Sequence, residues 1–157
     1  MYKKYINSFY LFVLALSIGA VFCAGALSAP VIFTASNYTI IDIDRFNSGL
    51  IMSEIFRRLN YLLNFNAFLI LLFEGWNYLT FKRDKIILIS SFITVCCTLL
   101  FTLYYTPFIL ESLLLGANKI LTPQFEGMHK GSEIAFKLLF ISLAVLFVKK
   151  VINYDKN

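Results

Sequence analysis

Apolar residues gather in four long stretches of this chain, and polar and charged residues gather between them. The stretches cover about residues 6–33, 59–81, 86–105 and 134–151, and each is near or above the roughly 20 residues that a helix needs to cross a bilayer. Polar positions inside them recur every three or four residues, which is the period of a helix face and not of a strand. The pattern predicts an all-α integral membrane four-helix bundle, with a single domain over residues 1–157.

The first stretch also has features of a secretory signal. Lys3 and Lys4 precede an apolar core, and Ala24-Gly25-Ala26 resembles a cleavage site. Signal cores are only about 7–15 residues long, however, and this one is already near spanning length before that point. A retained first helix is therefore expected.

The first long loop contains a helix start signal. Asp42 or Asp44 is placed to cap a helix that begins near Arg45, because a side-chain carboxylate there accepts from the first free backbone N–H groups. This helix is expected to lie on the bundle and to run directly into the second span.

The second long loop repeats such signals. Thr106-Pro107 ends the third span and predicts a new short helix over residues 108–115, because proline is favoured at the first helical position. Gly116 is expected to end that helix. Thr122-Pro123 predicts a last helix that starts near Pro123 and continues to about Val151.

The composition makes a soluble protein an unlikely reading of this pattern. Apolar residues make up 59% of the chain and charged residues 15%, against about 25% charged residues in soluble domains. Mean hydropathy is +0.76. A soluble enzyme or a nucleic-acid-binding module is therefore excluded as the default, and the lipid bilayer is the expected partner.

Basic residues predict the orientation. Eight lie at the two chain ends and in the turn before the third span, namely Lys3, Lys4, Lys82, Arg83, Lys85, Lys149, Lys150 and Lys156. The two longer loops have five spread over many more residues, and they hold six of the nine acids. Because basic residues favour the cytoplasmic side, both termini are expected in the cytoplasm of a multi-pass protein of the cytoplasmic (inner) membrane.

Each span presents a stripe of small or weakly polar residues. They are Ser8, Ala15, Gly19 and Cys23 in the first, Asn60, Asn64, Ala67, Glu74 and Tyr78 in the second, Ser91, Thr94, Thr98 and Thr102 in the third, and Ser132, Ala135 and Ser142 in the fourth. Such residues join helices in lipid through close packing and hydrogen bonds. The stripes are expected to meet inside the bundle, either as packing contacts or as a narrow polar path.

Glu74 is the only acid within a predicted span. An ionisable residue at membrane depth is a functional candidate. Its own helix has no basic residue within a turn of it, so Glu74 is expected either to be protonated or to bond hydroxyl groups of another helix. Proton-linked function and a buried structural carboxylic acid are the two alternatives.

His129 is the sole histidine and shares the outer loop with Glu111, Glu126 and Met128. This set suggests part of a copper or haem site, against the alternative of a hydrogen-bonding histidine at the membrane interface. The three cysteines all fall within spans and are expected to be small core residues. No nucleophile–base pair or phosphate-binding loop is present, so a non-enzymatic role is expected.

Four short motifs stand at the outer ends of the spans. They are Pro30-Val31-Ile32-Phe33, Ile55-Phe56-Arg57-Arg58-Leu59-Asn60, Thr106-Pro107 with Ile109, and Phe125 with His129 and Ser132. Together they resemble the transmembrane protein 205-like family, a group of small four-helix membrane proteins similar to the wider CopD-like group. Some CopD-like proteins are linked to copper handling and some to haem-pathway oxidation.

The resemblance implies a shared feature at the outer end. Its candidates are Pro30, Phe33, Phe56 and Pro107 as structural residues, and Arg57, His129 and Ser132 as ligand-binding residues. Helical spacing places Phe125, His129 and Ser132 on one face, so an outward-facing pocket with Arg57 and Glu111 is expected. The chain lacks the several histidines and methionines of a dedicated copper importer.

Three functions follow as hypotheses. The first is non-enzymatic handling or transport of a metal or small ligand at the outer pocket. The second is a scaffold or accessory subunit that binds other membrane helices or a second copy of itself. The third is a haem-dependent membrane oxidoreductase of CopD-like type.

Overall fold

The chain folds into helices joined by short turns, with no strand, over the part that the computed structural model describes, which is residues 2–40, 43–80 and 84–154. The longer elements are α1 (Tyr2–Phe22), α3 (Arg45–Leu79), α4 (Lys85–Leu99) and α7 (Pro123–Tyr154), and the shorter α-helices are α2 (Ala29–Phe33), α5 (Thr106–Leu114) and α6 (Ala117–Ile120). Two π-helices, η1 (Cys23–Ser28) and η3 (Leu100–Tyr105), and one 3₁₀-helix, η2 (Ala35–Asn37), complete the set. The predicted all-α class is confirmed.

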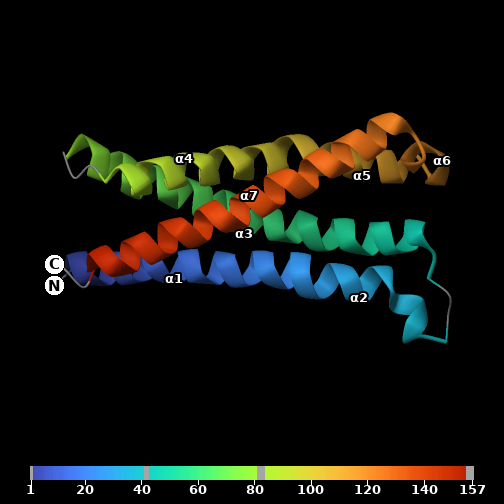
Figure 1. The fold of residues 1–157 in the computed structure, drawn as a ribbon, viewed down its shortest axis with the longest axis horizontal. Helices are drawn as coiled ribbons and strands as arrows, with labels where there is room; N and C mark the ends of the chain where they lie inside the picture. The colour runs from blue at the N-terminus through green and yellow to red at the C-terminus, as the bar shows by residue number, and fades with distance from the viewer. Residues whose placement is uncertain (1, 41–42, 81–83, 155–157) are drawn as a thin grey trace.

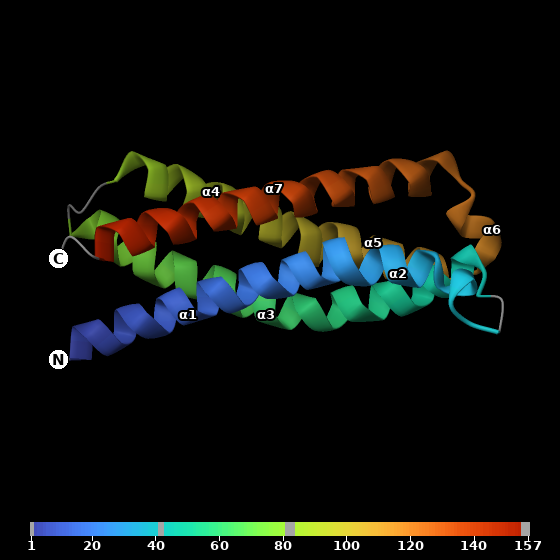
Figure 2. The same ribbon diagram turned by 60° about the horizontal axis from the view of Figure 1, so that its bottom comes forward.

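These elements form four long rods that lie alongside one another (Figure 1). The first rod is α1–η1–α2, the second α3, the third α4–η3–α5 and the fourth α7. α7 packs against α1 and α4, and α3 packs against the same two helices. Both chain ends lie at one end of the rods and α6 lies at the other (Figure 2).

Two predicted helix starts are confirmed. Asp44 precedes α3, and its Oδ1 accepts from the Asn47 N–H at 2.7 Å. α7 begins at Pro123, and the Thr122 hydroxyl oxygen accepts from the Phe125 N–H at 3.3 Å. The alternative cap at Asp42, the end of the second span at Phe81, and the charges of Lys3, Lys82, Arg83 and Lys156 lie outside the described residues or side chains.

The predicted break at Thr106-Pro107 is wrong. The chain stays helical there, since Thr106 has φ −60° and ψ −46°. A π-helix at η3 makes this possible, because its wider turn shifts the hydrogen-bond register just before the proline. The Thr106 hydroxyl donates to the Phe101 carbonyl, five residues back, at 2.8 Å. Gly116, with φ +101°, does follow the short helix as predicted.

Two glycines allow close helix contacts at the level of the π-helices. A Cβ on Gly25 would stand 2.8 Å from the Phe136 ring, and one on Gly131 would stand 2.7 Å from the Tyr105 hydroxyl. Phe136 also packs edge-on against Phe56, with ring centroids 5.3 Å apart. A larger residue at either glycine would therefore push apart two rods.

The polar stripes of α3, α4 and α7 are largely buried as expected, but that of α1 is not. Ala15, Gly19 and Cys23 are exposed. The buried face of α1 holds instead Tyr10, Val13, Leu14, Ser17, Val21 and Ala24. Bulkier side chains make the larger apolar contact here, so the small residues are left on the outside.

Two helical segments are long and apolar enough to cross a membrane among the residues described. They are Lys4–Phe33 and Lys85–Leu114, each of 30 residues. Length and composition therefore support association with a membrane.

Candidate functional site

The residues expected to form an outer pocket lie on different helices, and the contacts found for each are with near neighbours on its own helix. Arg57 donates from Nε to Oε2 of Glu54 at 2.7 Å, and Arg58 donates from Nε to Oε1 of Glu54 at 2.8 Å. Hydrogen bonds from Arg57 and then from Arg58 lower the pKa of Glu54 to about 2. The same pairing raises the pKa of Arg57.

His129 makes its contacts along α7. Its Nε2 lies 3.3 Å from Oε1 of Glu133, and its ring stacks with Phe125 at a centroid distance of 6.0 Å. The Ser132 hydroxyl donates to the His129 carbonyl at 2.7 Å, so Ser132 bonds the backbone and does not reach the imidazole. Glu111 lies exposed on α5.

The donor set around His129 does not fit a resident metal. The described residues contain no group of three histidine, cysteine, aspartate or glutamate side chains that could hold one. A closed zinc site takes four protein ligands, and soft copper sites take thiolate or several imidazoles. His129 and Glu133 together supply two ligands.

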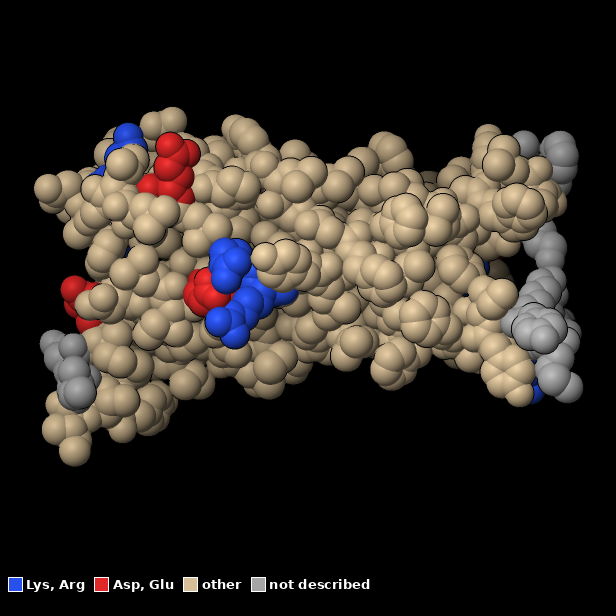
Figure 3. Space-filling model, turned by 180° about the vertical axis from the view of Figure 1, so that it is seen from behind, with Lys and Arg blue, Asp and Glu red and all other residues tan. Residues whose placement is uncertain are grey.

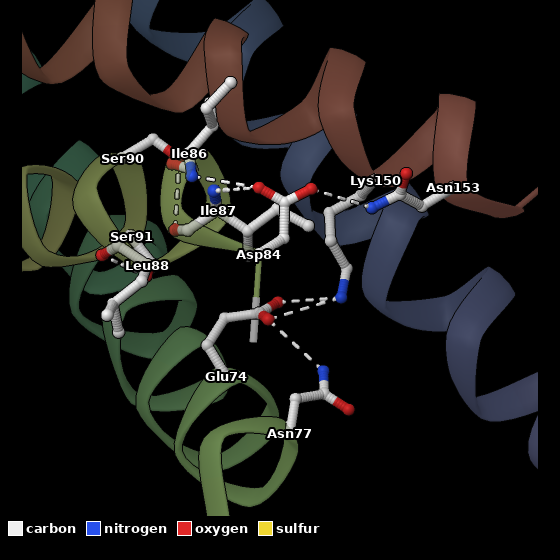
Figure 4. A network of polar contacts seen from close by, with 10 residues as sticks. All are labelled: Glu74, Asn77, Asp84, Ile86, Ile87, Leu88, Ser90, Ser91, Lys150 and Asn153. Atoms are coloured by element: carbon white, nitrogen blue, oxygen red, sulfur yellow. Dashed lines mark hydrogen bonds and ion pairs between the residues drawn. The ribbon is translucent and has the colours of Figure 1, made fainter. Parts of the chain in front are cut away.

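Glu74 sits at the other end of the rods and is the centre of a buried polar cluster (Figure 4). Lys150 of α7 places its Nζ 3.0 Å from Oε1 and 3.3 Å from Oε2 of this carboxylate. Asn77 donates from Nδ2 to Oε2 at 3.2 Å. The Glu74 side chain is 7% exposed and that of Lys150 is 18% exposed. The ion-pair partner of Glu74 is therefore a lysine, which was not anticipated from the sequence, and the Tyr10 hydroxyl of α1 lies against the same carboxylate.

The aromatic ring of Tyr10 closes the α1 side of this cluster. Tyr10 stacks on Phe73 with ring centroids 4.4 Å apart, and the Lys150 ammonium lies 5.4 Å from the Tyr10 ring centroid. The Tyr10 hydroxyl and Oε1 of Glu74 are both buried without an aligned hydrogen bond. Three rods therefore meet around one buried carboxylate.

A neighbouring contact ties α4 to the end of α7. Asp84 accepts at Oδ1 from the backbone N–H of Ile86 at 2.9 Å and at Oδ2 from Asn153 at 3.3 Å (Figure 4). Partial burial acts to raise the pKa of Asp84, but the hydrogen bonds from Asn153 and the backbone hold it below its ordinary value. This carboxylate caps α4 and holds the start of α4 against the end of α7, near Lys150.

Further polar contacts continue outward between the rods. Thr94 donates to the Ser142 hydroxyl at 3.0 Å, and Thr102 donates to Oδ1 of Asn64 at 2.8 Å. Three more buried oxygens have no hydrogen-bond partner among the described residues, those of the Ser17, Asn60 and Asn66 side chains. Buried polar groups are thus interspersed with the apolar core from the Glu74 cluster to Asn60, about midway along α3.

Sequence reasoning found Glu74, Asn60 and Asn64 but missed Lys150 and Tyr10. A signal for Lys150 was present. Ser132, Ala135 and Ser142 define the inward face of α7, and the same helical spacing carries that face through Leu139 and Leu146 to position 150. No comparable signal marked Tyr10, which lies among many interchangeable aromatic residues.

Comparison with protein families gives one match. The family described as a domain of unknown function (DUF4149) matches residues 12–118. The chain belongs to this family. The DUF4149 match includes Glu74 and the whole of α3, α4 and α5, while Lys150 lies beyond it. No curated protein and no solved structure matches the chain.

Proposed function

We propose that this DUF4149 protein is an integral four-helix bundle of the cytoplasmic membrane, with both termini in the cytoplasm, that passes protons or a small polar solute through its interior without enzymatic chemistry. Composition and the two long apolar helices support the membrane placement. Counting about 20 residues outward from Lys85 brings the outer lipid boundary near Tyr105, and counting from Leu79 brings it near Leu59.

The Glu74–Lys150 pair carries this proposal. Two charges taken out of water cost several kcal/mol each, and their attraction offsets this only with good geometry and further hydrogen bonds. Here Oε1 of Glu74 lacks an aligned donor. The pair therefore places two charged groups, held with incomplete hydrogen bonding, where a proton or polar solute entering the bundle would meet them.

The polar interior supplies the rest of the route. Buried polar atoms almost always have a partner, and internal water is the usual one where protein groups do not serve. Oxygens of Tyr10, Ser17, Asn66 and Asn60 lie at successive depths along α1 and α3. A chain of water molecules bonded to these atoms would connect the Glu74 cluster to the outer side.

Proton flux into liposomes tests the proposal. The purified protein is reconstituted with an internal pH-sensitive dye, and a pH gradient is imposed while potassium and valinomycin clamp the potential. We expect faster dissipation than in empty liposomes, with the rate of Glu74→Gln close to that of empty liposomes. Lys150→Arg keeps the charge and should keep the flux, and Glu126→Gln on the exposed face of α7 should not alter it. Wild-type flux equal to that of empty liposomes would overturn the proposal.

Metal handling at His129 is the alternative that the resemblance to the transmembrane protein 205-like and CopD-like groups supports. The two-ligand set described above does not complete a resident copper site. Elemental analysis of the purified protein beside His129→Ala tests it. Near-stoichiometric metal that is lost in the variant would shift the function to this site.

A scaffold role has one observation in its favour. The Ala15, Gly19 and Cys23 face of α1 is exposed, with no atom within 4 Å of a Cβ placed on Gly19. Small residues at this spacing allow close helix approach in lipid. Loss of a co-purifying membrane protein in Gly19→Leu, with proton flux absent in the wild type, would favour this role.

A further inference from the structure

The outward side of α3 includes a seam of exposed and half-buried residues spaced alternately three and four apart. Its members are Ile51, Glu54, Arg58, Tyr61, Phe65, Phe68, Leu72, Gly75 and Leu79. The buried residues of α3 fall between these positions and never on them. This 3.5-residue period is the a/d pattern by which two parallel helices pack along their length.

From this seam we infer that two copies of the chain associate through α3, as parallel helices about a two-fold axis normal to the membrane. The inference depends on the chain spanning the membrane, as proposed above, because a shared orientation in the bilayer makes the two α3 helices parallel. It does not depend on proton transfer.

Spacing alone does not select α3, because α7 also presents a seam. That seam is Ile134, Leu138, Ile141, Val145, Val148 and Ile152, all exposed. Every member is aliphatic, so lipid tails cover it without loss. The α3 seam instead ends in Glu54 and Arg58, which lie outward of the lipid boundary near Leu59, where a facing protein surface can pair their charges.

The α3 seam carries charges of both signs at its outer end. Glu54 and Arg58 stand one helical turn apart, with side chains 42% and 75% exposed, and Arg57 flanks them. Figure 3 shows a compact group of acidic and basic side chains in an otherwise uncharged part of this face. In a two-fold contact each residue i meets j while j meets i, so Glu54 of each copy reaches Arg58 of the other. Arg58 uses only Nε for its own Glu54, which leaves its terminal nitrogens as donors.

The surface is hollowed at the same place. A cavity of about 470 Å³ is lined by Leu50, Ile51, Glu54, Ile55 and Arg58, which are consecutive seam residues and their immediate flanks. Such a group of residues forms the hole that receives one side chain of a facing helix. The hollow lies outward of Leu59, beyond the lipid boundary estimated above, so a protein side chain and not a lipid tail is the suitable occupant.

Cysteine cross-linking in native membranes tests the inference. In a background with Cys23, Cys96 and Cys97 replaced by alanine, single cysteines are placed at Phe68 and Leu72 on the seam. A symmetric parallel contact brings each cysteine to its counterpart within disulfide reach, a Cα–Cα distance of about 4.4–6.8 Å. We expect rapid same-position cross-links there. Matched cysteines at Ile141 and Val145 on the α7 seam, and at Gly19 on α1, should give about tenfold less, because they face lipid.

Charge exchange at the outer end provides the second test. Arg58→Glu should raise the monomer fraction about tenfold, since it places like charges across the contact, and Glu54→Arg with Arg58→Glu should restore the dimer. Equal cross-linking on α7, stronger cross-linking at Gly19, or none on α3 would overturn the inference. The inference would also be overturned if native mass spectrometry showed a monomer with bound anionic lipid, and if that lipid were lost in Arg58→Gln. The dimer and the proton route are tested separately, because Glu74→Gln should abolish proton flux and leave the α3 cross-links unchanged.

Discussion

Lys150 and Glu74 are separated by 76 residues in sequence, and the lysine Nζ lies 3.0 Å from Oε1 of the glutamate. The pair joins α7 to α3. These two rods have few direct contacts, and each packs mainly against α1 and α4. The pair therefore fixes the register of helices that share little other surface.

Breaking this pair from one side should destabilise the protein strongly. Glu74→Leu leaves the Lys150 ammonium buried without a counter-charge, which costs about 3–5 kcal/mol in comparable sites. Replacing both residues, as Glu74→Leu with Lys150→Met, removes both charges and should recover most of that loss. The measurement is the free energy of unfolding in detergent by denaturant titration.

An exposed pair on α7 is the control for that prediction. Lys130 lies 2.6 Å from Glu126, outside the predicted span, with both side chains more than half exposed, and exposed pairs contribute about 0–1 kcal/mol. Lys130→Met should therefore change the free energy of unfolding by less than about 1 kcal/mol. A loss as large as that of Glu74→Leu would mean that burial is not the cause.

The pairing of Glu54 with two arginines predicts a pH dependence. Its pKa is lowered from 4.5 to about 2 in the folded chain, so the folded state favours the carboxylate. The stabilisation is present in full above about pH 4.5 and is lost as the pH falls towards 2. Melting temperatures of wild type and Glu54→Gln should differ by a constant amount above pH 5 and converge at about pH 2. A constant difference over the whole range would contradict the ion pair.

Local signals in the sequence were enough for most helix boundaries, because a cap is set by residues within one turn. Asp44 and Thr122 behave as their types predict. Thr106-Pro107 did not, because a π-helix absorbs the proline and a change of hydrogen-bond register leaves no mark in residue type. Helix starts were therefore predictable, whereas the continuity of the third rod was not.

The site was only half predictable, for a different reason. Glu74 stands out because it is an acid in an apolar stretch. Its partner Lys150 depends on how α7 packs across α3, which local sequence does not determine. The outer face of α1 shows the same limit. Ala15, Gly19 and Cys23 have the spacing of a packing stripe, yet larger apolar residues on the opposite side take the buried position.

Two glycines of α7 give a matched test of the close contact between α7 and η3. A Cβ on Gly131 would lie 2.7 Å from the Tyr105 hydroxyl oxygen and 2.9–3.0 Å from its ring carbons. Gly131→Ala should therefore destabilise the protein by about 1–3 kcal/mol, as overpacking does. Gly127 has no atom within 4 Å of such a Cβ, so Gly127→Ala should stabilise by up to about 1 kcal/mol through helix propensity.

Rescue distinguishes a local clash from general damage to α7. Tyr105→Leu removes the ring that Gly131→Ala would strike, so the double variant should be more stable than Gly131→Ala alone. If the two changes add independently in a double-mutant cycle, the contact is not the cause.

The Tyr10 hydroxyl gives the last and most direct test of the buried cluster. It is buried beside Glu74 without a hydrogen bond of good geometry, and a buried polar group left without one costs about 1–3 kcal/mol. If the cluster is dry, Tyr10→Phe keeps the stack on Phe73 and should raise the free energy of unfolding by about that amount. If water bonds the hydroxyl and continues towards Ser17, as the proposed route requires, Tyr10→Phe should lower proton flux and leave stability nearly unchanged or reduced. Measuring flux and unfolding on the same variant therefore decides between a polar route and a packed polar core.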